Sequence, residues 1–141
     1  QARRGLAGAM LGPLERLVQE RPDDDDAAHA LAKVREELAD IEMSADNPGA
    51  ALPLRRQVLE YWERRARSGP ATLQDVRDHA EAVIKLGNAL EALADDQPAE
   101  SPARVSGTAR ARELYVRAQD AQVAALERWP DDAGLLDDLC Y

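Results

Sequence analysis

Apolar residues recur at three- and four-residue steps along most of this chain, and this period constrains the fold more than any other feature. Between residues 23 and 45, for example, Leu31, Val34, Leu38 and Ile41 fall on one stripe of a helix. The strict alternation of apolar and polar residues that marks a half-buried strand is missing. We therefore expect an all-α fold. The same period places helices over residues 23–45, 49–67, 73–94 and 108–129.

The chain also matches itself at a distance. Pro22 precedes Leu38 by 16 residues, and Pro70 precedes Leu86 by the same 16. The small residues that follow the two leucines therefore coincide: Ala39 and Gly87.

The following helices match in the same way. Ala51 and Val58 stand seven residues apart, as do Ala111 and Ala118, and a proline follows each pair twelve residues later. The second copy is longer by 12 residues, the length of a Pro- and Ser-rich insertion at 95–106. We expect the segment up to Gly107 to be a loop or disordered. The chain then reads as one helical-repeat domain, 1–141, with a partial leading helix (1–21), repeat one (22–69), repeat two (70–129) and the start of a third repeat (130–141).

Gly87 lies inside the most helix-prone stretch of the chain, "AEAVIKLGNALEALADD". A glycine there costs about 1 kcal/mol relative to alanine. We expect it to lie where two helices cross, because the missing side chain lets the partner helix approach closely.

These patterns resemble the tetratricopeptide repeat family. On its first helix that family places an apolar residue, a Leu-Gly pair and a further apolar residue, filled here by Val83, Leu86, Gly87 and Leu90. On its second helix it places small and aromatic residues and a later proline, filled here by Ala111, Tyr115, Ala118 and Pro130. Repeat one departs from the pattern at Arg35, Ala39, Glu42 and Arg55. The resemblance implies antiparallel helix-turn-helix repeats, of a long-helix and degenerate variety, stacked as a short right-handed solenoid.

Composition excludes several classes of function. The net charge of −9 argues against binding nucleic acid or an anionic membrane. The single cysteine, Cys140, cannot form an internal disulfide, and no apolar run is long enough to span a membrane. We expect a cytoplasmic protein. Arginine supplies 16 of the 18 basic residues, which with the Ala and Asp bias favours a bacterial source.

Motifs for catalysis or cofactors are sparse. No serine or cysteine lies in a nucleophile motif, and no glycine-rich phosphate loop is present. Asp26 and His29 have the spacing of ligand pairs in di-metal helical bundles, which keeps a metal-binding bundle as an alternative. The second histidine, His79, has Val76 where that pair needs a carboxylate. We expect no enzyme activity, no catalytic residue, no metal and no cofactor.

The resemblance implies a protein-protein interaction module, a scaffold or sensor that binds a peptide or partner helix. In the family, the residue after the Leu-Gly pair and those one turn to either side face the binding groove. By position these are Lys33, Glu36, Asp40 and Met43 in repeat one, with Glu81, Ile84, Asn88 and Glu91 in repeat two. Carboxylates prevail among them, so we expect a basic or amphipathic protein partner, and neither nucleic acid nor membrane.

Two further expectations concern the context of the chain. It begins at Gln1 rather than Met and stops inside an apparent helix, and we expect it to belong to a larger bacterial signalling or defence protein. The alternative to a peptide-binding module is a structural or self-associating helical bundle without a peptide groove.

Overall fold

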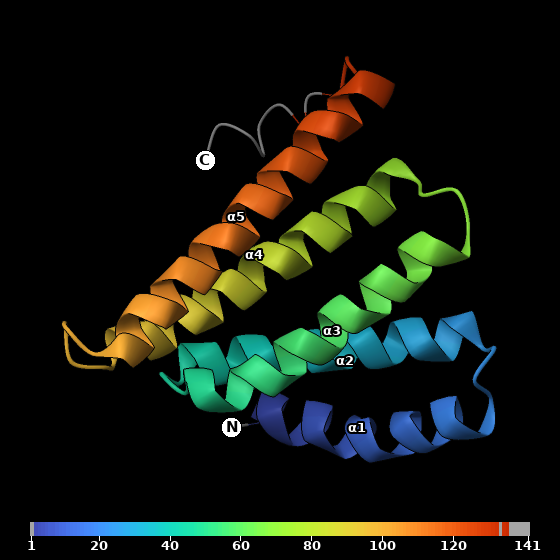
Figure 1. The fold of residues 1–141 in the computed structure, drawn as a ribbon. Coiled ribbons are helices and arrows are strands. Elements are labelled where there is room, and N and C mark those ends of the chain that lie inside the picture. Colours follow the sequence, from blue (N-terminus) through green and yellow to red (C-terminus); the bar gives the residue numbers. More distant parts are fainter. Residues whose placement is uncertain (1, 133, 136–141) are drawn as a thin grey trace. The chain divides into compact units, whose positions relative to one another are not determined.

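The computed structural model describes residues 2–132 and 134–135 of the 141-residue chain. Within these residues it contains five helices and no strand (Figure 1), so the predicted all-α class is confirmed. Stacking as a right-handed solenoid stays a prediction. The helices are α1 (Ala2–Glu20), α2 (Asp25–Ser44), α3 (Pro48–Ser68), α4 (Leu73–Asp95) and α5 (Pro102–Arg128).

The chain divides into two compact units, Gln1–Tyr61 (unit 1) and Trp62–Tyr141 (unit 2). The sequence predicts a single domain over 1–141, and each unit is described by itself below. Helix α3 begins in unit 1 and ends in unit 2.

In unit 1, α1 and α2 pack against each other as an antiparallel pair. Arg35 on α2 reaches Glu15 on α1 at 3.0 Å, whereas Glu42, further along α2, pairs with Arg4 near the start of α1 at 2.6 Å. Helix α2 begins where the Asp24 side chain accepts a hydrogen bond from the backbone N–H of Ala27 at 3.0 Å. That bond satisfies one of the free donors of the first turn, as an N-cap should.

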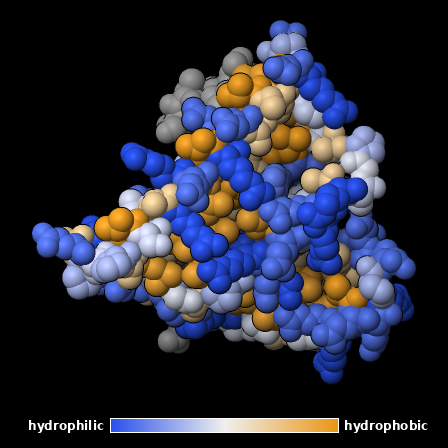
Figure 2. Space-filling model, in the orientation of Figure 1, coloured by the Kyte–Doolittle hydropathy of each residue, from blue (hydrophilic) through white to orange (hydrophobic). Residues whose placement is uncertain are grey.

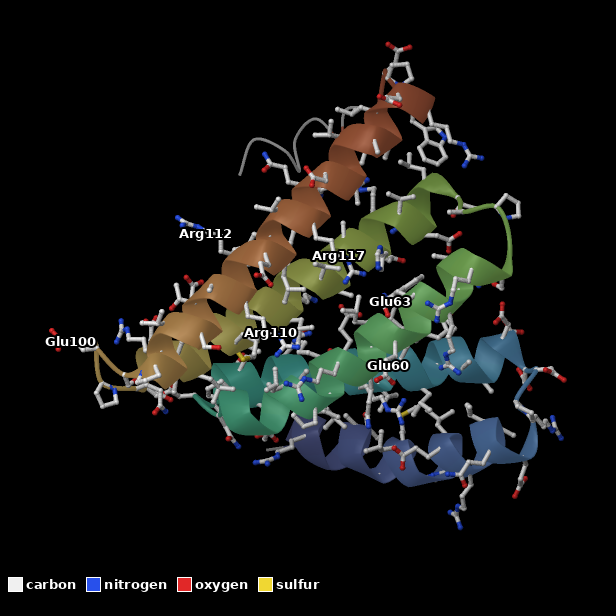
Figure 3. All side chains as sticks on the ribbon, in the orientation of Figure 1. Glu60, Glu63, Glu100, Arg110, Arg112 and Arg117 are labelled. Atoms are coloured by element: carbon white, nitrogen blue, oxygen red, sulfur yellow. The ribbon has the colours of Figure 1, made fainter. Side chains whose placement is uncertain are left out.

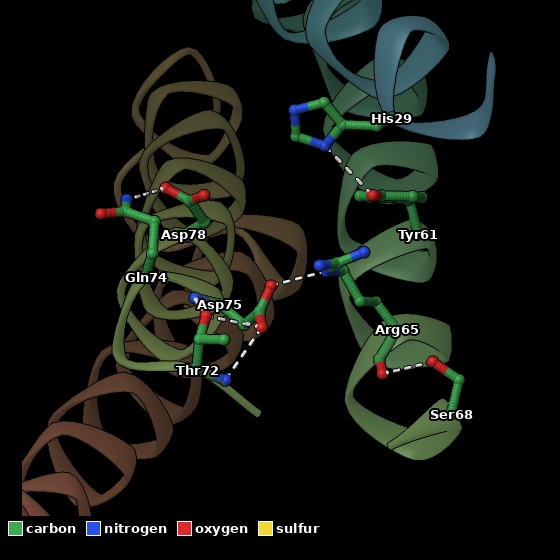
Figure 4. Close-up of polar contacts among 8 residues, drawn as sticks. All are labelled: His29, Tyr61, Arg65, Ser68, Thr72, Gln74, Asp75 and Asp78. Carbon is green, nitrogen blue, oxygen red and sulfur yellow. Dashed lines mark hydrogen bonds and ion pairs between the residues drawn. The ribbon is translucent and has the colours of Figure 1, made fainter. Parts of the chain in front are cut away.

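Helices α2 and α3 form an antiparallel hairpin in the same unit. Late in α2, Asp40 pairs with Arg55 near the start of α3. Early in α2, His29 Nδ1 lies 3.1 Å from the hydroxyl of Tyr61 further along α3 (Figure 4). Fully buried small and β-branched residues hold the two helices together: Ala39, Ala51 and Val58.

In unit 2, α4 and α5 form a second antiparallel hairpin. The ring of Tyr115 on α5 lies against Gly87, and Gly107, one turn into α5, lies against Ala94 near the end of α4. Small residues dominate the buried seam, so the two backbones approach closely. The buried residues of this seam are Ala80, Val83, Leu86, Ala89, Ala111, Ala118 and Ala125.

The two hairpins carry the same contact at corresponding positions. In the second hairpin, Tyr115 crosses Gly87 and its hydroxyl reaches Asn88, the next residue. In the first, Arg55 stands 60 residues before Tyr115 and pairs with Asp40, which follows the small residue Ala39. Each hairpin therefore has a long polar side chain on its second helix that bonds the residue after the small one on its first. This equivalence supports the repeat register.

The segment predicted as a loop at 95–107 is wrong in its second half. Ser101 caps α5 by accepting a hydrogen bond from the backbone N–H of Arg104 at 3.2 Å, and Pro102 takes the first helical position. Proline is preorganised for that position, so Ser-Pro starts a helix rather than continuing a loop. Arg104 then donates to the carbonyl of Asp95 at 3.3 Å and to that of Gln97 at 3.2 Å. These bonds tie the short connection to the end of α4.

The predicted start of a third repeat, 130–141, lies largely outside the described residues. Within them, residues 134 and 135 are helical and Leu135 is fully buried. In the described part of the chain, no helix is both long and apolar enough to cross a membrane.

Candidate binding surface

The start of α4 is fixed by a network of hydrogen bonds around Asp75 (Figure 4). Thr72 and Asp75 form a capping box, in which the Thr72 hydroxyl accepts from the Asp75 backbone at 3.1 Å and the Asp75 carboxylate accepts from the Thr72 backbone at 2.9 Å. Arg65, at the end of α3, donates to the same carboxylate at 2.5 Å. Burial raises the pKa of Asp75, but hydrogen bonds from Arg65 and Thr72 outweigh it, so that the pKa lies below its ordinary value.

Helix α4 presents the predicted repeat-two residues at steps of three, four and three, which places them on one stripe. Glu81, Asn88 and Glu91 are exposed, and Ile84 is half-buried. We call Glu81, Ile84, Asn88 and Glu91 the α4 stripe.

Tyr115 organises the second half of this stripe. Because Gly87 has no side chain, the Tyr115 ring crosses α4 there, and its hydroxyl lies 2.9 Å from Asn88 Oδ1 and 2.9 Å from Glu91 Oε2. One hydroxyl carries one proton, so it donates to one of these two oxygens at a time. Burial, the hydrogen bond to Glu91 and the charge of Glu91 raise the pKa of Tyr115 to about 12.

The first half of the stripe is also in a defined electrostatic setting. Lys85, one turn after Glu81, pairs with it at 2.8 Å. Helix α4 as a whole contains five carboxylates and two basic residues, a net charge of 2 − 5 = −3. The surface that α4 offers to solvent is therefore acidic.

The predicted repeat-one residues lie on α2 in unit 1. Lys33 is exposed and pairs with Glu36 at 3.3 Å. Asp40 pairs with Arg55, and Met43 is half-buried. Lys33, Glu36, Asp40 and Met43 form the α2 stripe, and α2 has a net charge of 2 − 6 = −4. The structure thus brings Asn88 and Glu91 together around Tyr115, and binds Asp40 to a buried arginine.

Sequence reasoning missed two residues of these stripes. Tyr115 matches an aromatic core position of the repeat family, and only the structure shows that its hydroxyl reaches two α4 stripe residues. Arg55 is a departure from the family's pattern, but it is the partner of Asp40. The available signal was that each lies four residues after a buried alanine, Ala51 or Ala111, on the helix that faces a small residue.

The two histidines are held in separate settings. His29 contacts the Tyr61 hydroxyl, while the Nε2 atom of His79 is buried without a hydrogen-bond partner. Burial and the nearby charge of Arg117 lower the pKa of His79, although Glu63 acts in the opposite direction. Among the described residues, no three His, Cys, Asp or Glu side chains are grouped so as to hold a metal ion.

Comparison with protein-family models found no matching family, and comparisons with curated proteins and with solved structures found no match.

Tyr115 provides a prediction about pH. Its pKa in the folded chain is about 12, against an ordinary value of 10.0. Because the folded pKa is the higher one, the stability contributed by the neutral hydroxyl is complete below pH 10 and is lost as pH rises from 10 towards 12. An ultraviolet titration should therefore show one of the three tyrosines ionising late, and Tyr115→Phe should remove that late component. Simultaneous ionisation of all three near pH 10 would contradict the hydrogen bond to Glu91.

Proposed function

We propose that this chain is a protein-protein interaction module, a tetratricopeptide-like scaffold or sensor that binds a basic or amphipathic peptide or helix. We further propose that it works as part of a larger bacterial signalling or defence protein. The proposal rests on the repeated hairpin contact and on the exposed acidic first helices.

One observation carries it furthest: the Tyr115 hydroxyl holds the side chains of Asn88 and Glu91 at an exposed face of α4. A side chain that is already ordered loses less conformational entropy when a partner binds. Asn88 supplies an amide for a partner's backbone or polar group, and Glu91 supplies a carboxylate for a lysine or arginine. The α4 stripe is thus a preorganised acceptor for a positively charged segment.

The charge distribution favours the same class of partner. Both first helices of the repeats are acidic, with net charges of −4 for α2 and −3 for α4. Such a field attracts basic segments and speeds their association at low ionic strength.

A pair of charge-swapped peptides tests the proposal. The first is a fluorescein-labelled amphipathic peptide with leucines on one helical face and lysines on the other, and the second replaces every lysine by glutamate. We expect the lysine peptide to bind, with an affinity that falls as salt is added, and the glutamate peptide not to bind. Glu81→Gln with Glu91→Gln should weaken binding of the lysine peptide about five- to tenfold in anisotropy titrations.

A matched control separates the α4 stripe from the overall negative charge. Asp96→Asn with Glu100→Gln removes the same charge from exposed residues of unit 2 outside the stripe, and should leave the affinity nearly unchanged. Asn88→Ala should weaken binding without changing its salt dependence, because the amide is neutral. Equal losses in the stripe variant and the control would refute the proposal.

A further inference from the structure

In the described part of the chain, the large hydrophobic side chains that are most exposed lie on only two helices, α1 and α5. Figure 2 shows hydrophobic atoms reaching the surface among charged side chains along α5. These residues, with their exposed fractions, are Leu6 (68%), Met10 (46%), Val105 (63%), Val116 (51%) and Val123 (50%). Terminal faces of helical arrays are normally polar, because they meet water.

The three exposed valines of α5 share one face. Val105 and Val116 are eleven residues apart, and Val123 follows after seven, so all three lie within about 20° of one another around the helix. The buried alanines Ala111 and Ala118 lie on roughly the opposite side. The valines therefore point away from α4, and we call them the α5 outer face.

A row of carboxylates borders this face. Glu113, Asp120 and Glu127 recur every seven residues, are exposed, and make no ion pair or hydrogen bond with the described residues. Arg112 lies beside the valines and points away from α4 (Figure 3). The α5 outer face is thus an apolar stripe with an unneutralised acidic edge.

The outer face of α1 has complementary properties. Leu6 and Met10 are one turn apart on the exposed side, whereas Ala7 is buried on the other. Arg16 is exposed and makes no ion pair or hydrogen bond with the described residues. We call Leu6, Met10 and Arg16 the α1 outer face.

We infer that the chain associates with itself head to tail, with the α1 outer face of one copy packed on the α5 outer face of another. This contact buries both sets of exposed hydrophobic residues and brings Arg16 towards the acidic row of α5. A symmetric contact between two α5 helices is disfavoured, because in an antiparallel pair Glu113, Asp120 and Glu127 would face their own copies. A head-to-tail contact leaves one face of each kind unused at the ends, so the assembly grows beyond a dimer or closes as a ring.

Two blocked variants test the geometry of this contact. Leu6→Asp with Met10→Asp blocks the α1 outer face, and Val116→Asp with Val123→Asp blocks the α5 outer face. Light scattering should show the average mass of the unchanged chain rising with concentration, while each variant alone stays monomeric. An equimolar mixture of the two variants should form a 1:1 dimer, because each supplies the face that the other lacks. Circular dichroism confirms that both variants remain helical.

The control introduces two aspartates elsewhere on exposed positions, as Gln57→Asp with Ala66→Asp on α3, and should associate as the unchanged chain does. An unchanged chain that remains monomeric at its highest soluble concentration would overturn the inference. So would a mixture of blocked variants that stays monomeric, or an α1-blocked variant that still forms dimers, which would indicate a symmetric α5 contact.

Discussion

Replacing Gly87 by leucine is expected to destabilise the fold by about 1–3 kcal/mol, although leucine is the better helix former. A Cβ atom at this position would lie 2.6 Å from Cε1 of Tyr115 and 3.1 Å from its Cδ1 and Cζ atoms. The ring has little freedom to swing away, because its hydroxyl is bonded to Asn88 and Glu91. The rest of a leucine side chain would need still more room between α4 and α5. Chemical denaturation of the two chains measures the difference.

The cause of that loss is checked in a second background. Gly87→Leu should cost much less when it is added to Tyr115→Ala, because the alanine removes the ring that the leucine would strike. Equal costs in both backgrounds would show that Tyr115 is not the obstacle. If Gly87→Leu is as stable as the unchanged chain, then the position does not lie at a helix crossing.

The second large effect concerns the buried arginine of unit 1. Arg55 is only 4% exposed, its guanidinium pairs with Asp40, and its Nε atom is buried without a partner. Asp40→Ala leaves a buried guanidinium without its carboxylate, and we expect a loss of about 1–3 kcal/mol. This range is below that for a fully buried ion pair, because the Asp40 side chain is 46% exposed.

Removing the charge itself should have the opposite outcome. Arg55→Met replaces the guanidinium by an apolar side chain of similar length, and is expected to be neutral or stabilising. Urea denaturation of both variants gives the comparison, with Asp40→Ala in the Arg55→Met background as the control, where its cost should largely vanish. If Arg55→Met loses as much stability as Asp40→Ala, then the ion pair contributes more than its burial costs.

The sequence was sufficient for the helices because their apolar period is a local property. Leu31 and Leu38 indicate α2 without knowledge of any partner, and both are buried in the structure. The start of α5 was missed because Pro102, counted as a loop residue, serves as the first residue of a helix capped by Ser101. Composition alone does not separate these two roles of proline; the preceding Ser and the distance to the helical period do.

The candidate surface was predictable only in part. Gly87 was expected at a helix crossing, and its contact with Tyr115 confirms this. The positions of Asn88 and Glu91 on one stripe followed from helical spacing, but their shared bond to Tyr115 depends on a side chain 24 to 27 residues later. Such a contact is set by how two helices pack, which a periodic pattern in either helix does not encode. The binding role of the stripe stays a prediction.

The most direct measurement of the proposed function is an amide spectrum of the chain during titration with the leucine-lysine peptide. The account predicts that the largest shifts occur along α4, at Glu81, Lys85, Asn88 and Glu91, and that they shrink as salt is added. It also predicts smaller shifts at Val116 and Val123 on the α5 outer face. Shifts confined to the α5 outer face, or a spectrum that the peptide leaves unchanged, would contradict binding at the α4 stripe.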